Sequence, residues 1–299
     1  MAKRYLFLEL GGWPEILILT APVTAIKTAE PDCHIDLITG QQNKEILDLT
    51  TVFDNVFYLN ESKSSLKELL SVLKKIHYDF YIDLQRRIYP QSQKFSSKVN
   101  SDHKIGYNKP AKKKPFDLNL SKTNHPHLID HYLKCLNLLE INHASGSYSL
   151  ETKPIKIETE RLSLLIHLQA GTIRTEIVEK LLNSHLQQMI DIKLLCAKND
   201  IAPFEKFQER LNTYSNLNEA IESVITASYL LTASSWLVQV ADILAVPVIY
   251  LSDGTDYDRL LSSIQTESVI LTPRSKKQSI QEISLDAMIH GIRSVCGFI

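Results

Sequence analysis

The chain has 299 residues, about the length of two domains, and its 44% hydrophobic and 22% charged residues are typical of a globular protein. A formal net charge of −1 excludes a global attraction to nucleic acid or to an anionic membrane. The four cysteines form no CxxC pair, the sequence starts without a signal peptide, and no apolar run could span a membrane, so we expect a cytoplasmic protein without disulfides or a zinc site.

The first part of the chain alternates strand-like with helix-like segments. Pro22 lies inside the first helix-like segment and should end or kink it. The alternation predicts a doubly wound domain with a mainly parallel sheet. The predicted strands are residues 4–10, 34–39, 52–58 and 78–84, and the predicted helices are residues 15–27, 45–49 and 64–77.

Residues 86–125 interrupt this alternation because they are polar and basic. Such a run is either a solvated face or an acceptor-side loop that attracts phosphate or carboxylate groups. A helix is predicted over residues 127–140. The histidines His125, His127 and His131 surround its start, but no carboxylate or cysteine completes a ligand set, so we expect no metal there.

Residues 141–160 are polar and contain Gly and Pro, which predicts a linker between domains 1–145 and 155–299. The second part again alternates strands and helices, so the chain is expected to be an α/β protein of two domains that face a cleft. The predicted strands are residues 161–168, 190–197 and 267–272, and the predicted helices are residues 176–189, 203–211, 218–227 and 280–295.

Residues 229–251 predict a compact βαβ unit, with strands at 229–231 and 248–251 and a short helix between them. The loops 232–235 and 252–256 then follow the carboxyl ends of two parallel strands, where open α/β sheets bind ligands. The first loop also leads into a helix N-terminus, which suits a phosphate. The alternative is a plain βαβ unit with nothing bound.

Several segments, in order and spacing, resemble those of the bacterial heptosyltransferase family (glycosyltransferase family 9), which transfers heptose from ADP-heptose to a growing lipopolysaccharide core. Each segment alone is a weak signal, and their shared order carries the resemblance. They are Tyr78-Asp79 through Asp83-Leu84-Gln85, Lys104-Ile105-Gly106, Ala241 to Val248, and Asp253-Gly254-Thr255.

The resemblance implies two Rossmann-like domains facing a cleft, the GT-B arrangement, and an inverting glycosyl transfer that needs neither metal nor cofactor. The implied donor is a nucleotide sugar, with an ADP-sugar favoured. The implied acceptor is a glycan or a lipid-linked glycan, as in lipopolysaccharide biosynthesis, with peripheral contact at the inner membrane. The alternative is a non-catalytic relative of the same fold that acts as a binding or scaffolding protein.

The family's acid in the first turn aligns with Ile16, so Glu15, one residue away, can replace it as the catalytic base only if the turn shifts register. The alternative role for Glu15 is an acid that complements the helix dipole. The family's Asp and His in the second loop align with Ser234 and Gln239, and a bulky Trp236 stands where a Gly is usual. The expected donor-binding residues are Arg174, Thr232, Ser234, Ser235, Gln239, Gly254 and Thr255, and the expected acceptor-binding residues are Gly11, Gly12, Gln85, Arg86, Arg87 and Lys104.

Overall fold

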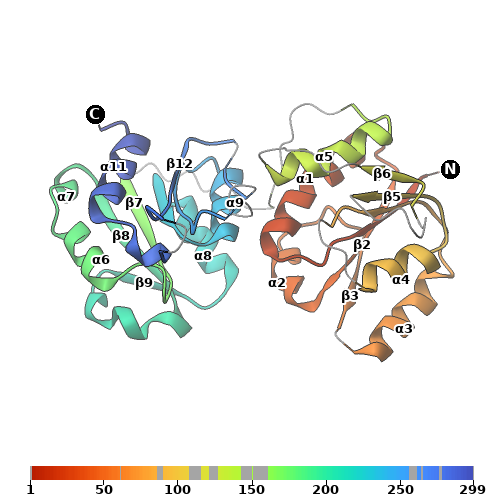
Figure 1. Ribbon diagram of the computed structural model, residues 1–299, viewed down its shortest axis with the longest axis horizontal. Coiled ribbons are helices and arrows are strands. Elements are labelled where there is room, and N and C mark those ends of the chain that lie inside the picture. The colour runs from red at the N-terminus through yellow and green to blue at the C-terminus, as the bar shows by residue number, and fades with distance from the viewer. Residues whose placement is uncertain are drawn as a thin grey trace. The chain divides into compact units, whose positions relative to one another are not determined.

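The computed structural model of the chain shows two compact units, Met1–Glu151 and Thr152–Ile299 (Figure 1). The boundary between the units falls within the predicted linker, residues 141–160. The structure describes residues 2–60, 62–85, 90–107, 116–120, 127–142, 150, 161–255, 261–263, 265–275 and 278–298.

Within the described residues, the N-terminal unit holds a six-stranded, all-parallel sheet with the strand order β3-β2-β1-β4-β5-β6. The central strand β1 is buried along nearly its whole length, as expected for a parallel sheet that is covered on both faces. The strands are β1 (Arg4–Leu8), β2 (His34–Gly40), β3 (Asn55–Leu59), β4 (Tyr78–Asp83), β5 (Ser101–Tyr107) and β6 (Leu118–Leu120).

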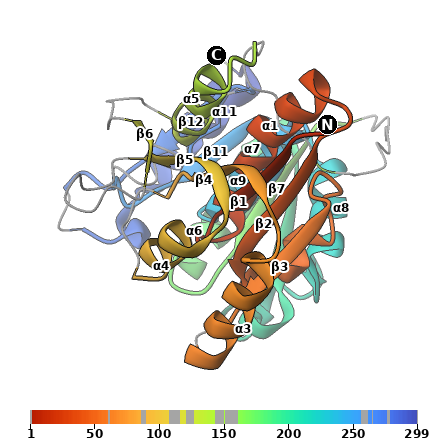
Figure 2. The same ribbon diagram turned by 90° about the vertical axis from the view of Figure 1, so that its right-hand side faces the viewer.

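Helices cover both faces of this sheet (Figure 2). The helices α1 and α5 pack against each other on one face. On the other face, apolar residues of α3 and α4 form a core with alternate residues of β1, including Leu6 and Leu8. The helices are α1 (Trp13–Ala29), α2 (Lys44–Leu47), α3 (Lys63–Leu73), α4 (Pro90–Lys98) and α5 (Leu128–Leu138), and a short 3-10 helix, η1 (Gln41–Asn43), precedes α2.

Pro22 was predicted to end or to kink the first helix, and it does not end it. Helix α1 continues through Pro22 to Ala29, and most of its residues from Glu15 to Ile26 are buried. A proline removes one backbone hydrogen bond from a helix interior, and the packing of the buried middle of α1, where Pro22 lies, compensates for that loss.

Residues 86–125 were predicted to interrupt the alternation of strands and helices, yet α4, β5 and β6 lie within that range. Helix α4 is mostly polar and is anchored by the buried side chains of Phe95 and Ser96. Strand β5 begins with polar residues, and only Ile105, Gly106 and Tyr107 are buried. Both elements depend on tertiary packing more than on their own hydrophobic pattern.

Within the described residues, the C-terminal unit holds a second six-stranded parallel sheet, in the order β12-β11-β10-β7-β8-β9. Strands β10 and β11 are parallel neighbours joined by α9, so the predicted βαβ unit is confirmed. The strands are β7 (Ser163–Leu168), β8 (Asp191–Ala197), β9 (Leu211–Tyr214), β10 (Tyr229–Thr232), β11 (Val248–Leu251) and β12 (Ser268–Leu271).

The helices of this unit also lie on two faces of the sheet (Figure 1). Apolar residues of α6, α7 and α11 pack on one face, against Leu164, Ile166 and Leu168 of β7, and α8 and α9 pack on each other beside the sheet. The helices are α6 (Thr175–Leu182), α7 (Leu186–Met189), α8 (Leu217–Ile225), α9 (Ser235–Ile243) and α11 (Leu285–Cys296). None of the helices in the described part of the chain has the length and apolar content of a bilayer span.

Three predicted helices of the second part differ from the structure. The helix predicted over 176–189 breaks into α6 and α7, because the Ser184 hydroxyl donates to the Leu181 carbonyl at 2.7 Å and accepts from the Leu186 N–H at 3.3 Å. The helix predicted over 203–211 is a 3-10 helix, η4 (Ala202–Phe207), followed by β9. The C-terminal helix predicted from residue 280 begins as the 3-10 turn η5 (Ile280–Glu282), before α11.

Candidate functional site

Each sheet has one point where the order of its strands reverses. In the N-terminal sheet, β1 is followed on one side by β2 and β3, and the chain then crosses to the other side of β1 to form β4. In the C-terminal sheet, β8 and β9 follow β7 on one side and β10 lies on the other. Open α/β sheets bind ligands outside the carboxyl ends of the strands at such switch points, so the ends of β1, β4, β7 and β10 are the candidate sites.

Glu9 lies directly after β1 at the N-terminal switch point. Its carboxylate is only 3% exposed. One oxygen, Oε1, accepts the N–H of Gly11 at 2.7 Å, and the other accepts the hydroxyl of Tyr132 on α5. A buried carboxylate is thus held by two donors between β1, α1 and α5.

Glu15 is the third residue of α1, and its side chain turns back toward the start of the helix. Its Oε2 accepts the N–H of Gly12 at 3.0 Å, and the residue is 9% exposed. An acid in this position complements the helix dipole, as one of the two predicted roles requires. The same arrangement directs the carboxylate to the carboxyl end of β1, so the hydrogen bond does not decide between the two roles.

Gly11 separates these two carboxylates. A Cβ atom added to Gly11 would lie 2.8 Å from Cδ of Glu15 and 2.9 Å from Oε1 of Glu9. Neither Gly11 nor Gly12, both within the described residues, has a positive φ. These two glycines therefore supply no unusual backbone angle, and Gly11 instead gives room for the two carboxylates.

The Glu9 carboxyl group titrates far from its ordinary range. Burial raises its pKa to about 7, and the negative charges of Glu15 and Asp83 act in the same direction. The hydrogen bonds from Tyr132 and Gly11 favour the ionised form and oppose this rise. A carboxyl group with a pKa close to neutral can exchange a proton at physiological pH, which is what acid–base catalysis requires.

Asp83 is the last residue of β4 and pairs with Leu8 across the sheet. It is fully buried and accepts the N–H of Gln85 at 3.2 Å and the hydroxyl of Ser92 on α4. Gln85, one of the expected acceptor-binding residues, is buried beside it with 3% of its surface exposed. Arg86 and Arg87 lie outside the described residues.

Lys104 lies in the middle of β5, opposite Tyr81 of β4. It is three residues before Tyr107, the carboxyl end of β5. Its Nζ donates to the carbonyl of Ser96 at 2.7 Å, near the end of α4, where a cation is favourable to the helix dipole. Burial lowers the pKa of Lys104. Lys104, an expected acceptor-binding residue, therefore already has a hydrogen-bond partner within the N-terminal unit.

At the C-terminal switch point a chain of hydrogen bonds joins three strands. Nδ1 of His167 on β7 lies 3.2 Å from Oγ1 of Thr232 on β10, and Nε2 lies 3.1 Å from the hydroxyl of Tyr214 on β9. Thr232 Oγ1 also accepts the N–H of Ser234 at 3.0 Å. Burial lowers the pKa of His167 to about 4, so the imidazole is neutral at physiological pH and fixes the turn that starts α9.

Two helix N-termini follow the strands of this switch point. Ser235 is the first residue of α9, after Ser234, which is largely buried, and Trp236 beside it is half-buried. Arg174 is exposed and immediately precedes α6, which follows β7. Among the described residues no ion pair involves Arg174. The sequence-predicted diphosphate residues are therefore located at the ends of two neighbouring strands.

The remaining expected donor residues differ in accessibility. Gln239 of α9 is fully buried, and its Nε2 donates to the carbonyl of Leu261. Gly254 has a φ of +80°, which favours glycine. Thr255 is exposed, and its N–H donates to Asp253 Oδ1 at 2.9 Å. Residues 252–255, directly after β11, are thus shaped by local hydrogen bonds.

The histidines near α5 serve the fold. His127 accepts the N–H of Ile129 at 3.0 Å at the start of α5, and Nδ1 of His131 is 2.8 Å from the hydroxyl of Tyr107. His125 lies outside the described residues. In the part of the chain that the structure describes, no three His, Cys, Asp or Glu side chains gather as they would around a metal ion.

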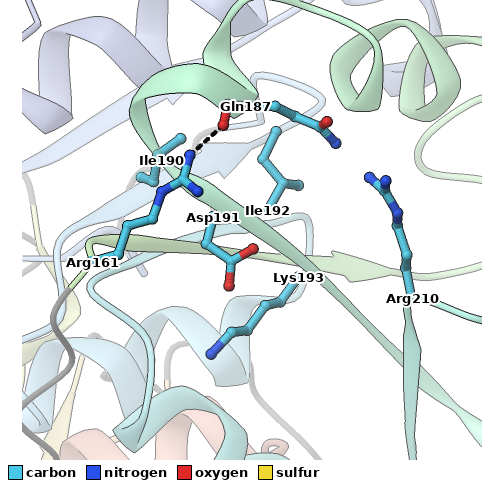
Figure 3. A pocket seen from close by; sticks show the side chains of 7 residues that line it. All are labelled: Arg161, Gln187, Ile190, Asp191, Ile192, Lys193 and Arg210. Atoms are coloured by element: carbon cyan, nitrogen blue, oxygen red, sulfur yellow. Dashed lines mark hydrogen bonds between the residues drawn. The ribbon is translucent and has the colours of Figure 1, made fainter.

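A polar pocket of about 410 Å³ lies at the opposite, amino edge of the C-terminal sheet (Figure 3). Asp191 begins β8, and Arg161 and Arg210 come shortly before β7 and directly before β9. Figure 3 shows the side chains of Lys193 and Arg210 pointing away from each other, while Arg161 donates to the carbonyl of Gln187. These cations do not converge on one point, and the switch-point loops lie at the other edge of the sheet.

The sequence reading missed Glu9, Asp83 and Tyr132. A usable signal existed for the two acids, because each stands at the carboxyl end of a strand, next to apolar or aromatic residues, where a buried charge needs a reason. Tyr132 had no such signal, since a tyrosine on an amphipathic helix usually belongs to the core.

No profile of a known protein family matches the sequence, and no curated protein does. Several solved structures, in contrast, are similar to this chain. A glycosyl transferase family 9 protein from Veillonella parvula DSM 2008 has a TM-score of 0.76 at 14% identity, and the match covers 99% of this chain and 98% of that one. The E. coli heptosyltransferase WaaC with ADP-2-deoxy-2-fluoro heptose has a TM-score of 0.73 at 14% identity, with 97% and 99% covered. The E. coli ADP-heptose lps heptosyltransferase II has a TM-score of 0.69 at 12% identity, with 98% of both chains covered. The likeness concerns the fold: this chain consists of two Rossmann-like domains of the GT-B type, like these glycosyltransferases.

Proposed function

We propose that the protein is a glycosyltransferase that transfers a sugar from a nucleotide-diphosphate donor to a glycan acceptor, with inversion at the anomeric carbon. One observation carries the proposal. In a fold that matches glycosyltransferases over nearly its full length, the acid Glu15 is held beside a second carboxylate at the N-terminal switch point. An ADP-sugar is the favoured donor, because two similar structures contain ADP or an ADP-heptose analogue.

The proposed donor site is the C-terminal switch point. The N–H groups that begin α9, after the Thr232–Ser235 turn, and the guanidinium of Arg174 would hold the diphosphate and stabilise its charge as it leaves. These groups take the part that a metal ion plays in other transferases. Gly254 and Thr255, directly after β11, are proposed to complete this site, whereas the buried Gln239 donates to the Leu261 carbonyl and is proposed to support it indirectly.

In the proposed reaction the oxygen of an acceptor hydroxyl attacks the anomeric carbon, and the bond from that carbon to the diphosphate oxygen breaks. The hydroxyl proton passes to Glu15, and the departing diphosphate keeps the electron pair of the broken bond. The main chain of Gly11 and Gly12, with Gln85, Arg86, Arg87 and Lys104, remains the proposed acceptor side. A lipid-linked acceptor, as the name of heptosyltransferase II indicates for that enzyme, would bring this cytoplasmic protein to the inner membrane.

Glu15→Gln tests the assignment of the base, because the amide keeps the shape of the side chain and removes its basicity. We expect kcat to fall by about 10²–10⁴-fold while donor affinity persists. Glu68→Gln is the matched control, since Glu68 is an exposed acid of α3 in the same unit. Full turnover by Glu15→Gln would assign the base to another residue.

A non-catalytic binding protein of the same fold is the second candidate. The half-buried Trp236 favours it, because a bulky side chain stands at the start of α9 where a phosphate would approach the backbone. This candidate predicts that donors bind without being consumed, or do not bind at all.

A further inference from the structure

Glu9 and Glu15 lie close together and differ in their surroundings. Both carboxylates are within 3 Å of the point that a Cβ of Gly11 would occupy, so they face each other across one backbone residue. Glu9 is the deeper of the two and receives the Tyr132 hydroxyl and the Gly11 N–H, whereas Glu15 receives the Gly12 N–H nearer the surface.

The groups that face Glu9 come from every element packed around it. Helix α1 contributes the charge of Glu15, β4 contributes the charge of Asp83, and α5 contributes the neutral hydroxyl of Tyr132. Arg86 and Arg87, which follow β4, lie outside the described residues. Two negative charges thus act on a buried third one, and two nearby carboxylates in a poorly solvated site resist being ionised together.

We propose that Glu9 and Glu15 form a coupled carboxylate pair that binds a single proton, and that Glu9 thereby raises the proton affinity of the base Glu15. Glu9 does not touch the acceptor and acts through Glu15. The catalytic consequence rests on the proposed function, but the coupling itself is a property of the free protein. The pair is the base: when both members are ionised, an acceptor proton delivered to Glu15 relieves their repulsion.

The chemistry of the hydrogen bonds allows both states of the pair. With both carboxylates ionised, Tyr132 donates to Glu9. When the pair holds a proton on Glu9, that carboxyl O–H can donate a hydrogen bond to the phenol oxygen, because a tyrosine hydroxyl is both donor and acceptor. The pKa of Glu9, raised to about 7 by burial and by its neighbours despite two opposing hydrogen bonds, agrees with a pair that takes up its proton near neutral pH. A base of that strength suits a reaction at neutral pH better than a lone glutamate does.

The test is a pH titration of the full-length protein, without substrate, with the glutamate side-chain carboxyls followed by carbon-13 NMR. The wild type should show a carboxyl step near pH 7. Glu9→Gln should abolish this step, and Glu15→Gln should move it down by about one unit or more, because the charge of its partner is gone. Tyr132→Phe should move it up, since the lost hydrogen bond favours ionised Glu9, and this variant keeps the volume of the side chain if Glu9→Gln does not fold.

Two results would overturn the pair: a wild type without a carboxyl step near neutral pH, or a step that Glu15→Gln leaves unmoved. Activity gives a second readout. The acidic limb of kcat/KM against pH should lie near neutral in the wild type and move to lower pH in Glu9→Gln, whereas a purely structural role would lower the whole profile without moving the limb. If the wild type transfers no sugar, the proposed function is refuted. The coupling of Glu9 and Glu15 would still be tested by the NMR titration of the free protein.

Discussion

At the scale of single residues, the site is defined by how closely carboxylates approach a glycine. Gly11 has an ordinary backbone conformation, yet an added methyl group would collide with both Glu9 and Glu15. The sequence predicted both Gly11 and Gly12 as acceptor-binding residues. It could not show that Gly11 limits the space for these acids, because that depends on a side chain four residues later in α1 and on one from the end of β1.

Gly11→Ala should therefore displace the Glu15 carboxylate without removing it. The end of a flexible side chain can move away, so we expect kcat to fall with little loss of thermal stability. Gly12→Ala is the comparison, because its added Cβ would lie 3.6 Å or more from any neighbour. Turnover and melting temperature, measured side by side, check this: Gly12→Ala should lose less activity, and the reverse order would contradict the geometry.

At the scale of elements, the sequence predicted those helices and strands that can be recognised from the apolar residues within their own segment. The strands β1, β2 and β4 and the β10–α9–β11 unit were predicted because each carries apolar or aromatic residues at the spacing of a strand or a helix. Helix α4 and strand β9 were missed, since both are short and polar and are stabilised by neighbours that are distant in sequence. For the same reason the partner of Gln239, the Leu261 carbonyl, could not be predicted.

The helix N-termini after β7 and β10 are the elements proposed to bind the diphosphate. Arg174→Ala should weaken the binding of an ADP-sugar by about 1.5–3 kcal/mol, the range of a charge-assisted hydrogen bond. Arg210→Ala is the matched control, since Arg210 is an exposed arginine at the pocket on the opposite edge of the same sheet. Calorimetry separates the two edges, and a loss of affinity in Arg210→Ala but not in Arg174→Ala would move the donor site to that pocket.

At the scale of the whole molecule, each unit has its own sheet, its own switch point and its own buried titratable group. The sequence predicted two α/β domains, and their limits at 1–145 and 155–299 stay a prediction. Strand order could not be read from the sequence, because it depends on which edge each new strand joins. The switch points, and with them the roles of Glu9 and His167, became visible only in the fold.

The two units should respond to pH in opposite directions. The pKa of Glu9 is raised from 4.5 to about 7 in the folded state, so its contribution to stability is present below pH 4.5 and is lost as the pH rises through 7. The pKa of His167 is lowered from 6.5 to about 4, so its contribution is present above pH 6.5 and is lost as the pH falls through 4. Each shift corresponds to about 3 kcal/mol.

The two tryptophans allow each unit to be followed separately, because Trp13 belongs to the N-terminal unit and Trp236 to the C-terminal one. In Trp236→Phe the remaining Trp13 reports urea unfolding of the N-terminal unit, whose stability should fall as the pH rises through 7. In Trp13→Phe the remaining Trp236 reports the C-terminal unit, whose stability should fall as the pH falls through 4. Adding Glu9→Gln should flatten the first trend, and adding His167→Gln should flatten the second. Trends that both substitutions leave unchanged would show that other groups control the response to pH.

Glycosyl transfer is tested most directly by measuring the release of nucleoside diphosphate from a panel of ADP- and UDP-sugars by the wild-type protein, with and without glycan acceptors. We expect that one donor, an ADP-sugar in the first place, is consumed only when an acceptor is present, with one glycosylated product for each diphosphate released. A donor that binds and is never consumed, across the whole panel, would contradict transfer and favour the binding-protein alternative. If no donor bound at all, the proposed nucleotide site would be wrong as well.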